Sequence, residues 1–192
     1  MHRLSSVLIA VSLLAWLSSF MSAATAQSTG AKTAAAKRVE RALFAAGCFW
    51  KTQYIFSKVP GVIHTEVGYT GGTTKNPSYE QVCSHQTGHA ETTEVEFDPS
   101  KVSYQTLLKV FFEHHDPTTL NRQGPDVGTN YRSAIFCTTP EQKKLAMEYK
   151  EQLEKQHKFP GPITTVIQDA GAFYPAEDYH QDYFVKHGEV CN

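Results

Sequence analysis

The stretch RALFAAGCFWKTQYIFSKV, residues 41–59, predicts a strand that turns into a helix at a cysteine. Residues 41–46 form a short apolar run, Gly47 interrupts it, and apolar residues then recur at helical spacing from Phe49 to Val59. Cys48 therefore lies at a strand-to-helix junction, where the start of a helix favours thiolate over thiol. The alternative is an ordinary core cysteine among aromatic residues.

Further strands are expected over residues 62–69, 91–97, 131–137 and 162–168, and helices over residues 48–58, 103–114 and 140–157. The strands are rich in β-branched or aromatic residues, and the second helix has apolar residues at i, i+3, i+4 and i+7. Thr139, Pro140 and Gln142 predict a capping box at the start of the third helix. A long helix between strands indicates an α+β or α/β fold in two layers.

Residues 1–26 have the three parts of a secretory signal peptide: a basic start, an apolar stretch from Val7 to Phe20, and the site Ala24-Thr25-Ala26. Cleavage would leave Gln27 first, then a disordered segment over residues 27–40. A single catalytic domain with a mobile C-terminal tail is expected over residues 41–192. The alternative is an uncleaved anchor. The protein is expected to be soluble and periplasmic or secreted.

The chain carries 18 Lys and Arg residues against 19 Asp and Glu residues, a formal net charge of −1. No basic patch or run suggests a nucleic-acid partner, and no stretch after the signal peptide is long and apolar enough to span a membrane. The partner is therefore expected to be small or a peptide.

The four cysteines, Cys48, Cys83, Cys137 and Cys191, contain no C-x-x-C spacing. In an exported protein an even number of cysteines also fits two structural disulfides, with three possible connectivities. A secreted, disulfide-stapled binding protein without enzymatic activity is therefore one alternative. A domain of about 150 residues needs no such staples, however, because it can bury its own core.

Glu91 opens the expected strand ETTEVEF, in which side chains alternate between two faces. Glu91 shares one face with Val95 and Phe97, whereas Glu94 and Glu96 share the solvent face. Burial raises the pKa of a carboxyl group and can keep it protonated as a proton donor. The alternative is an exposed Glu91 at a frayed strand end.

Two long loops, residues 68–91 and 114–133, are unusual in a compact domain unless they carry function. They contain Tyr79, Asp126 and Tyr131, which become candidates for the site. The histidine pairs in these loops lack the spacing of a known zinc motif, so no metal and no cofactor are expected.

The chain resembles the peptide methionine sulfoxide reductase A family. The matching segments, in family order across residues 41–184, are GCFW (47–50), GYTGG (68–72), NPSYEQVCS (76–84), TGHAE (87–91), FDPSKVSYQTLL (97–108), HHDPTTLNRQGPDVGTNYRS (114–133) and AEDYHQDY (176–183). The resemblance implies an α+β fold, a two-layer sandwich with a ferredoxin-like βαβ core and long functional loops. It also implies reduction of the S epimer of methionine sulfoxide, free or in proteins, with a thioredoxin-like thiol donor.

The resemblance implies a role for each matching residue. Cys48 would be the nucleophile and Glu91 the acid that protonates the sulfoxide oxygen, and Phe49 and Trp50 would form an apolar pocket for the substrate methyl group. Tyr79 and Tyr131 would hydrogen-bond the oxygen, and Asp126 would orient the polar side of the pocket.

Turnover requires a second thiol, because reduction leaves Cys48 as a sulfenic acid. Cys191 in the tail is the best candidate, with Cys83 and Cys137 as competitors. The tail KHGEVCN lacks the family's glycine-rich run and a second tail cysteine. The chain also differs from many relatives near Cys48: Lys51 replaces a Gly or Cys, and Gln53 replaces a Glu. The protein is expected to be a monomer that repairs oxidised exported proteins.

A papain-like thiol hydrolase is the strongest alternative enzyme. His180 lies 132 residues after Cys48, with Asn192 beyond, which falls within the papain spacing. The residues around Cys48 do not fit that family, and Asn192 is the last residue of the chain.

Overall fold

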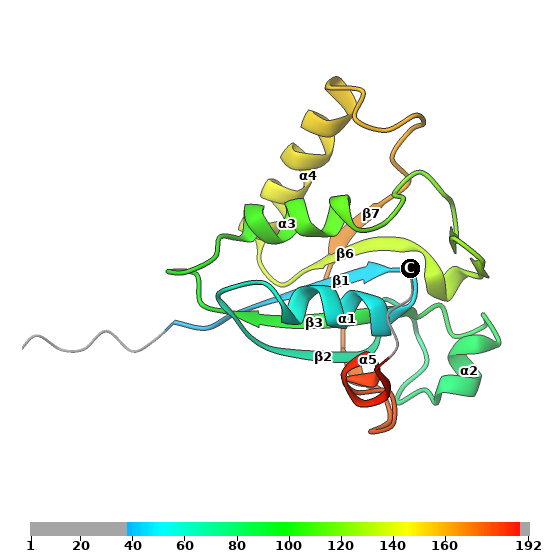
Figure 1. The fold of residues 1–192 in the computed structure, drawn as a ribbon. Coiled ribbons are helices and arrows are strands. Elements are labelled where there is room, and N and C mark those ends of the chain that lie inside the picture. Colours follow the sequence, from blue (N-terminus) through cyan, green and yellow to red (C-terminus); the bar gives the residue numbers. More distant parts are fainter. Residues whose placement is uncertain (1–37, 189–192) are drawn as a thin grey trace, which may run out of the picture. The chain divides into compact units, whose positions relative to one another are not determined.

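A six-stranded sheet organises residues 38–188, the part of the chain that this computed structural model describes (Figure 1). In spatial order its strands are β7 (Val166–Asp169), β6 (Ser133–Cys137), β1 (Glu40–Ala46), β3 (Ala90–Phe97), β2 (Val62–Thr70) and β8 (Tyr174–Pro175). Strands β6 and β7 pair in parallel, and the other neighbours pair antiparallel. The expected signal peptide, most of segment 27–40 and Cys191 lie outside the described residues.

Three helices cover one face of this sheet: α1 (Phe49–Ser57), α3 (Tyr104–Glu113) and α4 (Pro140–Lys155). In Figure 1, α1 lies over the central strands, whereas α3 and α4 lie together beside β6. The main core is formed by apolar side chains of these helices and of the facing strands, including Phe44, Phe56, Val95, Phe97, Leu107, Leu108, Phe111 and Ile135. A smaller cluster on the other face contains Leu43, Phe136 and Phe173.

Strand β3 lies between β1 and β2 and is antiparallel to both. The chain therefore runs from β1 through α1 to a strand of the same direction two places away, and then returns through β3. The predictions of strands over 41–46, 62–69 and 91–97 and of the three main helices are confirmed to within two residues at each end.

The alternation predicted for β3 is also confirmed, because Glu91 pairs with Tyr69 and Val95 with Ala42 on the face that the helices cover. The exposure expected for Glu94 was wrong. Glu94 is only 7% exposed, since the Arg41 guanidinium forms an ion pair with it on the opposite face of the sheet.

The predictions for the second half of the chain need three corrections. The strand expected over 131–137 begins at Ser133, because residues Thr129–Tyr131 form a short 3-10 helix, η1. The strand expected over 162–168 begins at Val166, since Thr164 donates its backbone N–H to Pro117 of the neighbouring loop. The capping box is half formed. The Thr139 hydroxyl accepts a hydrogen bond from the Gln142 backbone N–H, but the Gln142 side-chain carbonyl accepts from the backbone N–H of Thr138 instead of that of Thr139.

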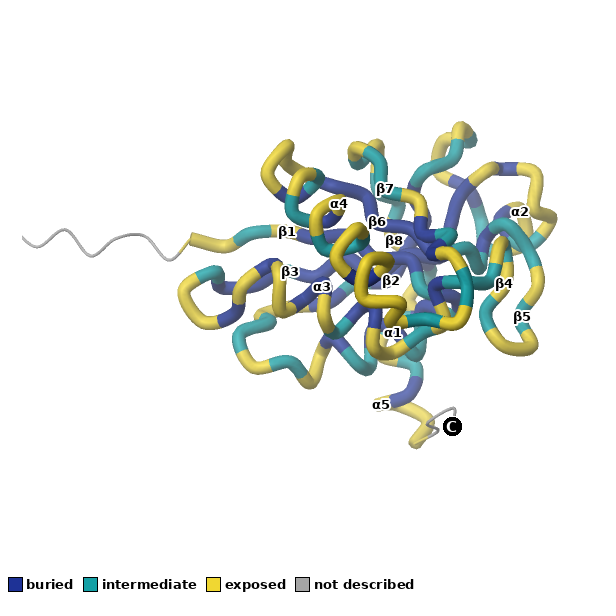
Figure 2. The backbone as a smooth tube through the Cα atoms, turned by 90° about the horizontal axis from the view of Figure 1, so that it is seen from above, coloured by how far each residue is buried: buried dark blue, intermediate teal, exposed yellow. Residues whose placement is uncertain are grey.

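Both long loops contain short helices or strands, which can hold side chains of the loops in fixed positions. Helix α2 (Tyr79–Cys83) interrupts the first loop, and the second contains a small hairpin of β4 (Arg122–Gln123) and β5 (Asp126–Val127). Figure 2 shows this hairpin with an exposed tip, in contrast to the buried central strands. A last short helix, α5 (Tyr183–His187), follows β8. Within residues 38–188 no helix has both the length and the apolar character to cross a membrane.

Candidate active site

Cys48 is the N-cap of α1, two residues after the end of β1, as the sequence predicts. The preceding Gly47 has φ +86°, and a Cβ atom there would lie 2.5 Å from Cβ of Gln123. Only glycine fits both this conformation and this close approach. The glycine therefore lets the chain turn sharply and presents a half-buried thiol at the helix start.

The pKa of the Cys48 thiol is raised to about 12, chiefly by burial and then by the negative charge of Glu91. The backbone N–H groups of Trp50 and Lys51 lower it, as expected at a helix start, but their effect is smaller. The expectation that Cys48 favours the thiolate was therefore wrong for the unliganded protein. When Glu91 is protonated, its contribution to the raised pKa disappears.

Glu91 is 2% exposed and lies on the same face as the helices, so a frayed and solvated strand end is excluded. Its Oε2 accepts a hydrogen bond from the Phe49 N–H at 3.2 Å, and its Oε1 lies 3.5 Å from the Asn130 amide nitrogen. Burial, with a smaller contribution from the charge of Asp126, raises the pKa of Glu91 to about 8 despite these donors. Glu91 is therefore largely protonated at neutral pH and lies against the residue that follows Cys48.

The second long loop brings Asp126 and Tyr131 to this carboxyl group. Tyr131 ends η1, and its hydroxyl donates to Glu91, which lowers the pKa of the carboxyl group. Burial and then the charge of Glu91 raise the pKa of Tyr131 to about 12, so its hydroxyl remains a donor at neutral pH. The negative charge of Asp126 raises the pKa of both Glu91 and Cys48.

Tyr79 comes from the first long loop as the first residue of α2. A capping box between Ser78 and Gln81, which sequence analysis missed, starts this helix. The Tyr79 hydroxyl interacts with the Cys83 thiol, and its pKa is raised by burial and by that hydrogen bond, with a further contribution from the charge of Glu91. The structure therefore brings Cys48, Glu91, Tyr79, Asp126 and Tyr131 to one place from five separate elements.

An aromatic wall, formed by Phe49, Trp50, Tyr79 and His180, borders this group. Phe49 is 1% exposed and packs with Tyr69, whereas Trp50 is half-buried. The His180 ring packs against both Phe49 and Tyr79, with its centroid 5.1 Å from that of Phe49 and 4.5 Å from that of Tyr79. The predicted pocket residues Phe49 and Trp50 thus stand beside the thiol, and His180 is a wall residue that sequence analysis did not assign to a pocket.

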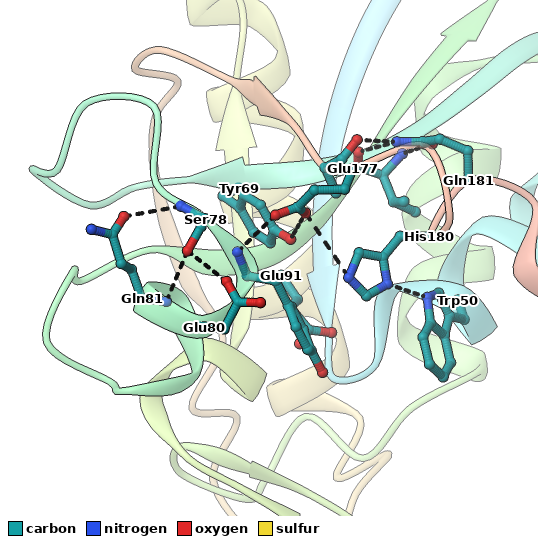
Figure 3. A network of polar contacts seen from close by, with 12 residues as sticks. Trp50, Tyr69, Ser78, Glu80, Gln81, Glu91, Glu177, His180 and Gln181 are labelled. Carbon is teal, nitrogen blue, oxygen red and sulfur yellow. Dashed lines mark hydrogen bonds and ion pairs between the residues drawn. The ribbon is translucent and has the colours of Figure 1, made fainter.

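A polar network centred on Glu177 fastens the C-terminal segment to this wall (Figure 3). Glu177 accepts hydrogen bonds from the Tyr69 hydroxyl and from the Tyr79 backbone N–H, each at 2.9 Å. The Trp50 indole donates to Nδ1 of His180 at 3.0 Å, and the Tyr183 ring stacks on Trp50 with a centroid separation of 3.7 Å. Sequence analysis missed Glu177, Tyr69 and Asn130, although all three lie in or beside the segments that carry the family resemblance.

The geometry of His180 gives no support to a thiol hydrolase. Its Nδ1 accepts from Trp50, and its Nε2 lies 4.0 Å from Glu177. The titratable side chains that act on the Cys48 thiol are the acidic groups of Glu91 and Asp126. Within residues 38–188 no imidazole is paired with Cys48 as a hydrolase would require.

His89 and Cys137 have structural surroundings. His89 accepts from the Gly72 N–H and donates to the Thr74 carbonyl, which ties the two sides of the first loop together. Among the cysteines that the structure describes, Cys48, Cys83 and Cys137 are free thiols, with Cys137 buried at a strand end, as predicted, beside Tyr104. In the described part of the chain no group of three or more His, Cys, Asp or Glu residues is arranged to hold a metal ion.

Known proteins have similar sequences and similar folds. The family model described as "Peptide methionine sulfoxide reductase" matches residues 40–192. The chain is 55% identical over 152 residues to the peptide methionine sulfoxide reductase MsrA of Methanoculleus marisnigri, covering 79% of this chain and 93% of that protein.

Solved structures agree. Methionine sulfoxide reductase A of Corynebacterium diphtheriae is similar with a TM-score of 0.71 and 38% identity, covering 80% of this chain and 77% of that chain. Reduced Mxr1 from Saccharomyces cerevisiae is similar with a TM-score of 0.76 and 35% identity, covering 81% and 89%. Mxr1 has also been solved in complex with Trx2, with a TM-score of 0.54 and 26% identity over 76% and 85%. The chain therefore belongs to the peptide methionine sulfoxide reductase family and is a thiol-dependent oxidoreductase that reduces methionine sulfoxide to methionine.

Proposed function

We propose that Cys48 is the nucleophile of this reduction and Glu91 its general acid. The Cys48 thiolate attacks the sulfoxide sulfur, an S–S bond forms, and Glu91 gives its proton to the sulfoxide oxygen. The hydroxyl group then passes to the Cys48 sulfur as the S–S bond breaks. Methionine leaves reduced by two electrons, and Cys48 is left as a sulfenic acid, oxidised by two electrons.

The observation that carries this assignment is the buried carboxyl group beside the thiol. Oxide is a very poor leaving group, so the reaction needs a proton at the sulfoxide oxygen as sulfur is attacked. Glu91, with a pKa of about 8 and a hydrogen bond from the residue after Cys48, holds such a proton at neutral pH. In this protonated form it also no longer opposes ionisation of Cys48 through its charge.

The surrounding residues fit recognition of a methyl sulfoxide group. Phe49 and Trp50 of the aromatic wall would hold the methyl group, and the protonated hydroxyls of Tyr79 and Tyr131 would donate to the oxygen. Asp126 would orient the polar side and help to keep Glu91 protonated through its negative charge. We propose the S epimer as the substrate, as the family resemblance implies.

A second thiol must clear the sulfenic acid. The Cys191 thiol would attack the Cys48 sulfur, form a disulfide and release water, and a dithiol donor would then reduce that disulfide by exchange. The complex of Mxr1 with Trx2 supports a thioredoxin-like donor. Cys83 beside Tyr79 and the buried Cys137 are the competing partners.

We further propose that the chain is an exported monomer that repairs oxidised exported proteins, a proposal that rests on residues 1–26 and predicts a mature protein beginning at Gln27. N-terminal sequencing of the exported protein checks the cleavage site.

For the fold, the strand order β6-β1-β3-β2, with β3 antiparallel to both of its neighbours, supports a ferredoxin-like core of the split βαβ type. The helices form its second layer.

The decisive experiment is single-turnover reduction of resolved S and R epimers of a methionine sulfoxide peptide by pre-reduced protein. We expect reduction of the S epimer alone, with two thiols lost per methionine formed. Mass mapping of the oxidised protein should then show a Cys48–Cys191 disulfide. No reduction of either epimer would overturn the proposed site, and a Cys48 disulfide to Cys83 or Cys137 would overturn the assignment of Cys191.

A further inference from the structure

Asn130 is a buried amide that the mechanism above does not use. It is the middle residue of η1, and its side chain is 0% exposed. Its Nδ2 lies 3.5 Å from Oε1 of Glu91, at the outer limit of a hydrogen bond. Its Oδ1 is buried and accepts no hydrogen bond from any residue within 38–188. Burying an amide with one unpaired end is costly, so this position calls for a reason.

The Asn130 side chain turns its nitrogen toward Glu91 and its oxygen toward Gly128. The neighbouring Gly128 has φ +151°, and a Cβ atom there would lie 2.6 Å from Asn130 Oδ1 and 2.2 Å from Cε1 of His85. The oxygen is thus packed against a bare Cα on one side, and the nitrogen points to the acid on the other. In this orientation the amide is a donor toward Glu91.

We propose that Asn130 is a positioning residue for the general acid, which stabilises the carboxylate that Glu91 becomes as its proton passes to the sulfoxide oxygen. This inference rests on the proposed role of Glu91. A donor at 3.5 Å contributes little to the neutral acid, but it shortens and strengthens when Oε1 gains negative charge. Asn130 thus acts late in proton transfer, where stabilisation raises the rate rather than substrate affinity.

Asn130 is suited to this role because its amide can stabilise the Glu91 carboxylate without carrying a charge itself. The titratable groups that face Glu91 from the surrounding elements are Cys48, Tyr69, Tyr79, Cys83, Asp126 and Tyr131. None of them is a cation, so Glu91 keeps its proton until the substrate takes it. A lysine or arginine at this position would ionise the acid in advance, whereas the amide favours the carboxylate only modestly.

The test is the pH dependence of single-turnover reduction in Asn130→Leu and Asn130→Asp, compared with the unaltered protein. Leucine keeps the volume and removes the donor; aspartate keeps the shape and adds a charge. In both variants we expect the loss of activity at high pH to move upward, by about one pH unit in Asn130→Leu and further in Asn130→Asp. The plateau rate should fall about tenfold, with KM changed less than about twofold, because the weaker acid gives up its proton less readily.

The carboxyl group itself provides a second readout. In a Cys48→Ser background, the carbon-13 NMR signal of Glu91 should titrate at higher pH after either substitution, a shift that a purely structural role of Asn130 would not produce. Gln142→Leu is the matched control, because Gln142 is also a buried amide that donates to a backbone carbonyl, far along the chain on α4. It should lower stability and leave the pH profile unchanged.

The outcomes separate the two proposals. If Asn130→Leu and Asn130→Asp leave the pH profile and the Glu91 titration unchanged while Glu91→Gln is strongly impaired, Asn130 has no influence on the acid and the inference fails. If Glu91→Gln itself is unimpaired, the proposed function of Glu91 fails. Should Asn130→Leu not fold, Asn130→Asp, which differs from the unaltered chain by one atom group, decides by the same titration.

Discussion

Glu91 and Glu94 lie three residues apart on β3, both buried, yet their surroundings are opposite. Glu94 lies on the face away from the helices, where the half-exposed guanidinium of Arg41 forms an ion pair with it. Glu91 lies on the helix face, where neutral donors and a nearby carboxylate surround it and its pKa rises to about 8. The difference teaches that the presence of a cation, more than burial itself, separates a structural carboxylate from a proton donor.

The strongest test replaces each glutamate in turn. Glu91→Gln should lower the single-turnover rate at pH 7 by at least about tenfold, since a placed general acid contributes about 10² to 10⁴. Glu94→Gln should leave that rate unchanged and cost about 1 kcal/mol of stability, because Arg41 can return to solvent. Rapid-quench kinetics and urea unfolding measure the two effects.

Equal losses of rate in the two variants would remove the contrast between the glutamates. In the unaltered protein, the same kinetics should show activity that declines above about pH 8, as Glu91 loses its proton. Glu91→Gln should lack this decline.

His115 extends the comparison to a basic side chain, which becomes a cation when it binds a proton. Its Nδ1 bonds the Phe111 carbonyl and its Nε2 the Ser133 hydroxyl, each at 2.7 Å, and burial lowers its pKa to about 4. The folded protein therefore binds fewer protons than the unfolded chain between about pH 4 and pH 6.5, so stability falls as the pH falls through this window, by up to about 3 kcal/mol.

Urea unfolding between pH 4 and pH 7 measures this effect. His115→Gln can still donate and accept but cannot titrate, so its stability should vary less with pH in that window. The exposed neighbour provides the control, because His114→Gln should keep the slope of the unaltered protein. An unchanged slope in His115→Gln would show that another group causes the acid sensitivity.

A third buried carboxyl group can be introduced at residue 53 of α1. Gln53 is buried, donates to the Thr65 carbonyl at 3.1 Å, and accepts from the Asp182 N–H at 2.8 Å. Glutamate at this position reproduces both hydrogen bonds only when protonated. The folded pKa of the new carboxyl should therefore exceed its unfolded value of about 4.3, and stability should be lost as the pH rises through the folded pKa.

We expect Gln53→Glu to be about 1 to 2 kcal/mol less stable at pH 8 than at pH 5, relative to the unaltered protein. Urea unfolding at the two pH values measures the change. Gln152→Glu makes the same substitution on an exposed surface of α4 and should show no such difference. If the two variants behave alike, burial at residue 53 does not perturb the carboxyl group.

Sequence periodicity was sufficient for the main helices and the central strands, because each is long enough to show its repeat. It could not find α2, α5 or the two-residue strands, which are held by caps and by contacts with distant segments. The alternation in β3 placed Glu91 correctly, since position in a strand determines the face.

The sequence was a poorer guide to electrostatics. It predicted the helix start at Cys48 but not the depth of burial, which reverses the direction of the thiol pKa. It placed Glu94 in solvent, because the pairing with Arg41 depends on the register of two strands that are distant in the chain. Asn130 escaped notice for the same reason: its contact with Glu91 joins residues 39 positions apart.

The contacts of Trp50 also make it an optical probe. The chain contains two tryptophans, and the other, Trp16, lies within the segment expected to be removed. A protein that begins at Gln27 therefore carries a single indole, whose nitrogen bonds His180 and whose ring stacks on Tyr183 of α5. Its fluorescence reports at once on the aromatic wall and on the attachment of α5, so that movement of either can be followed in solution without an added label.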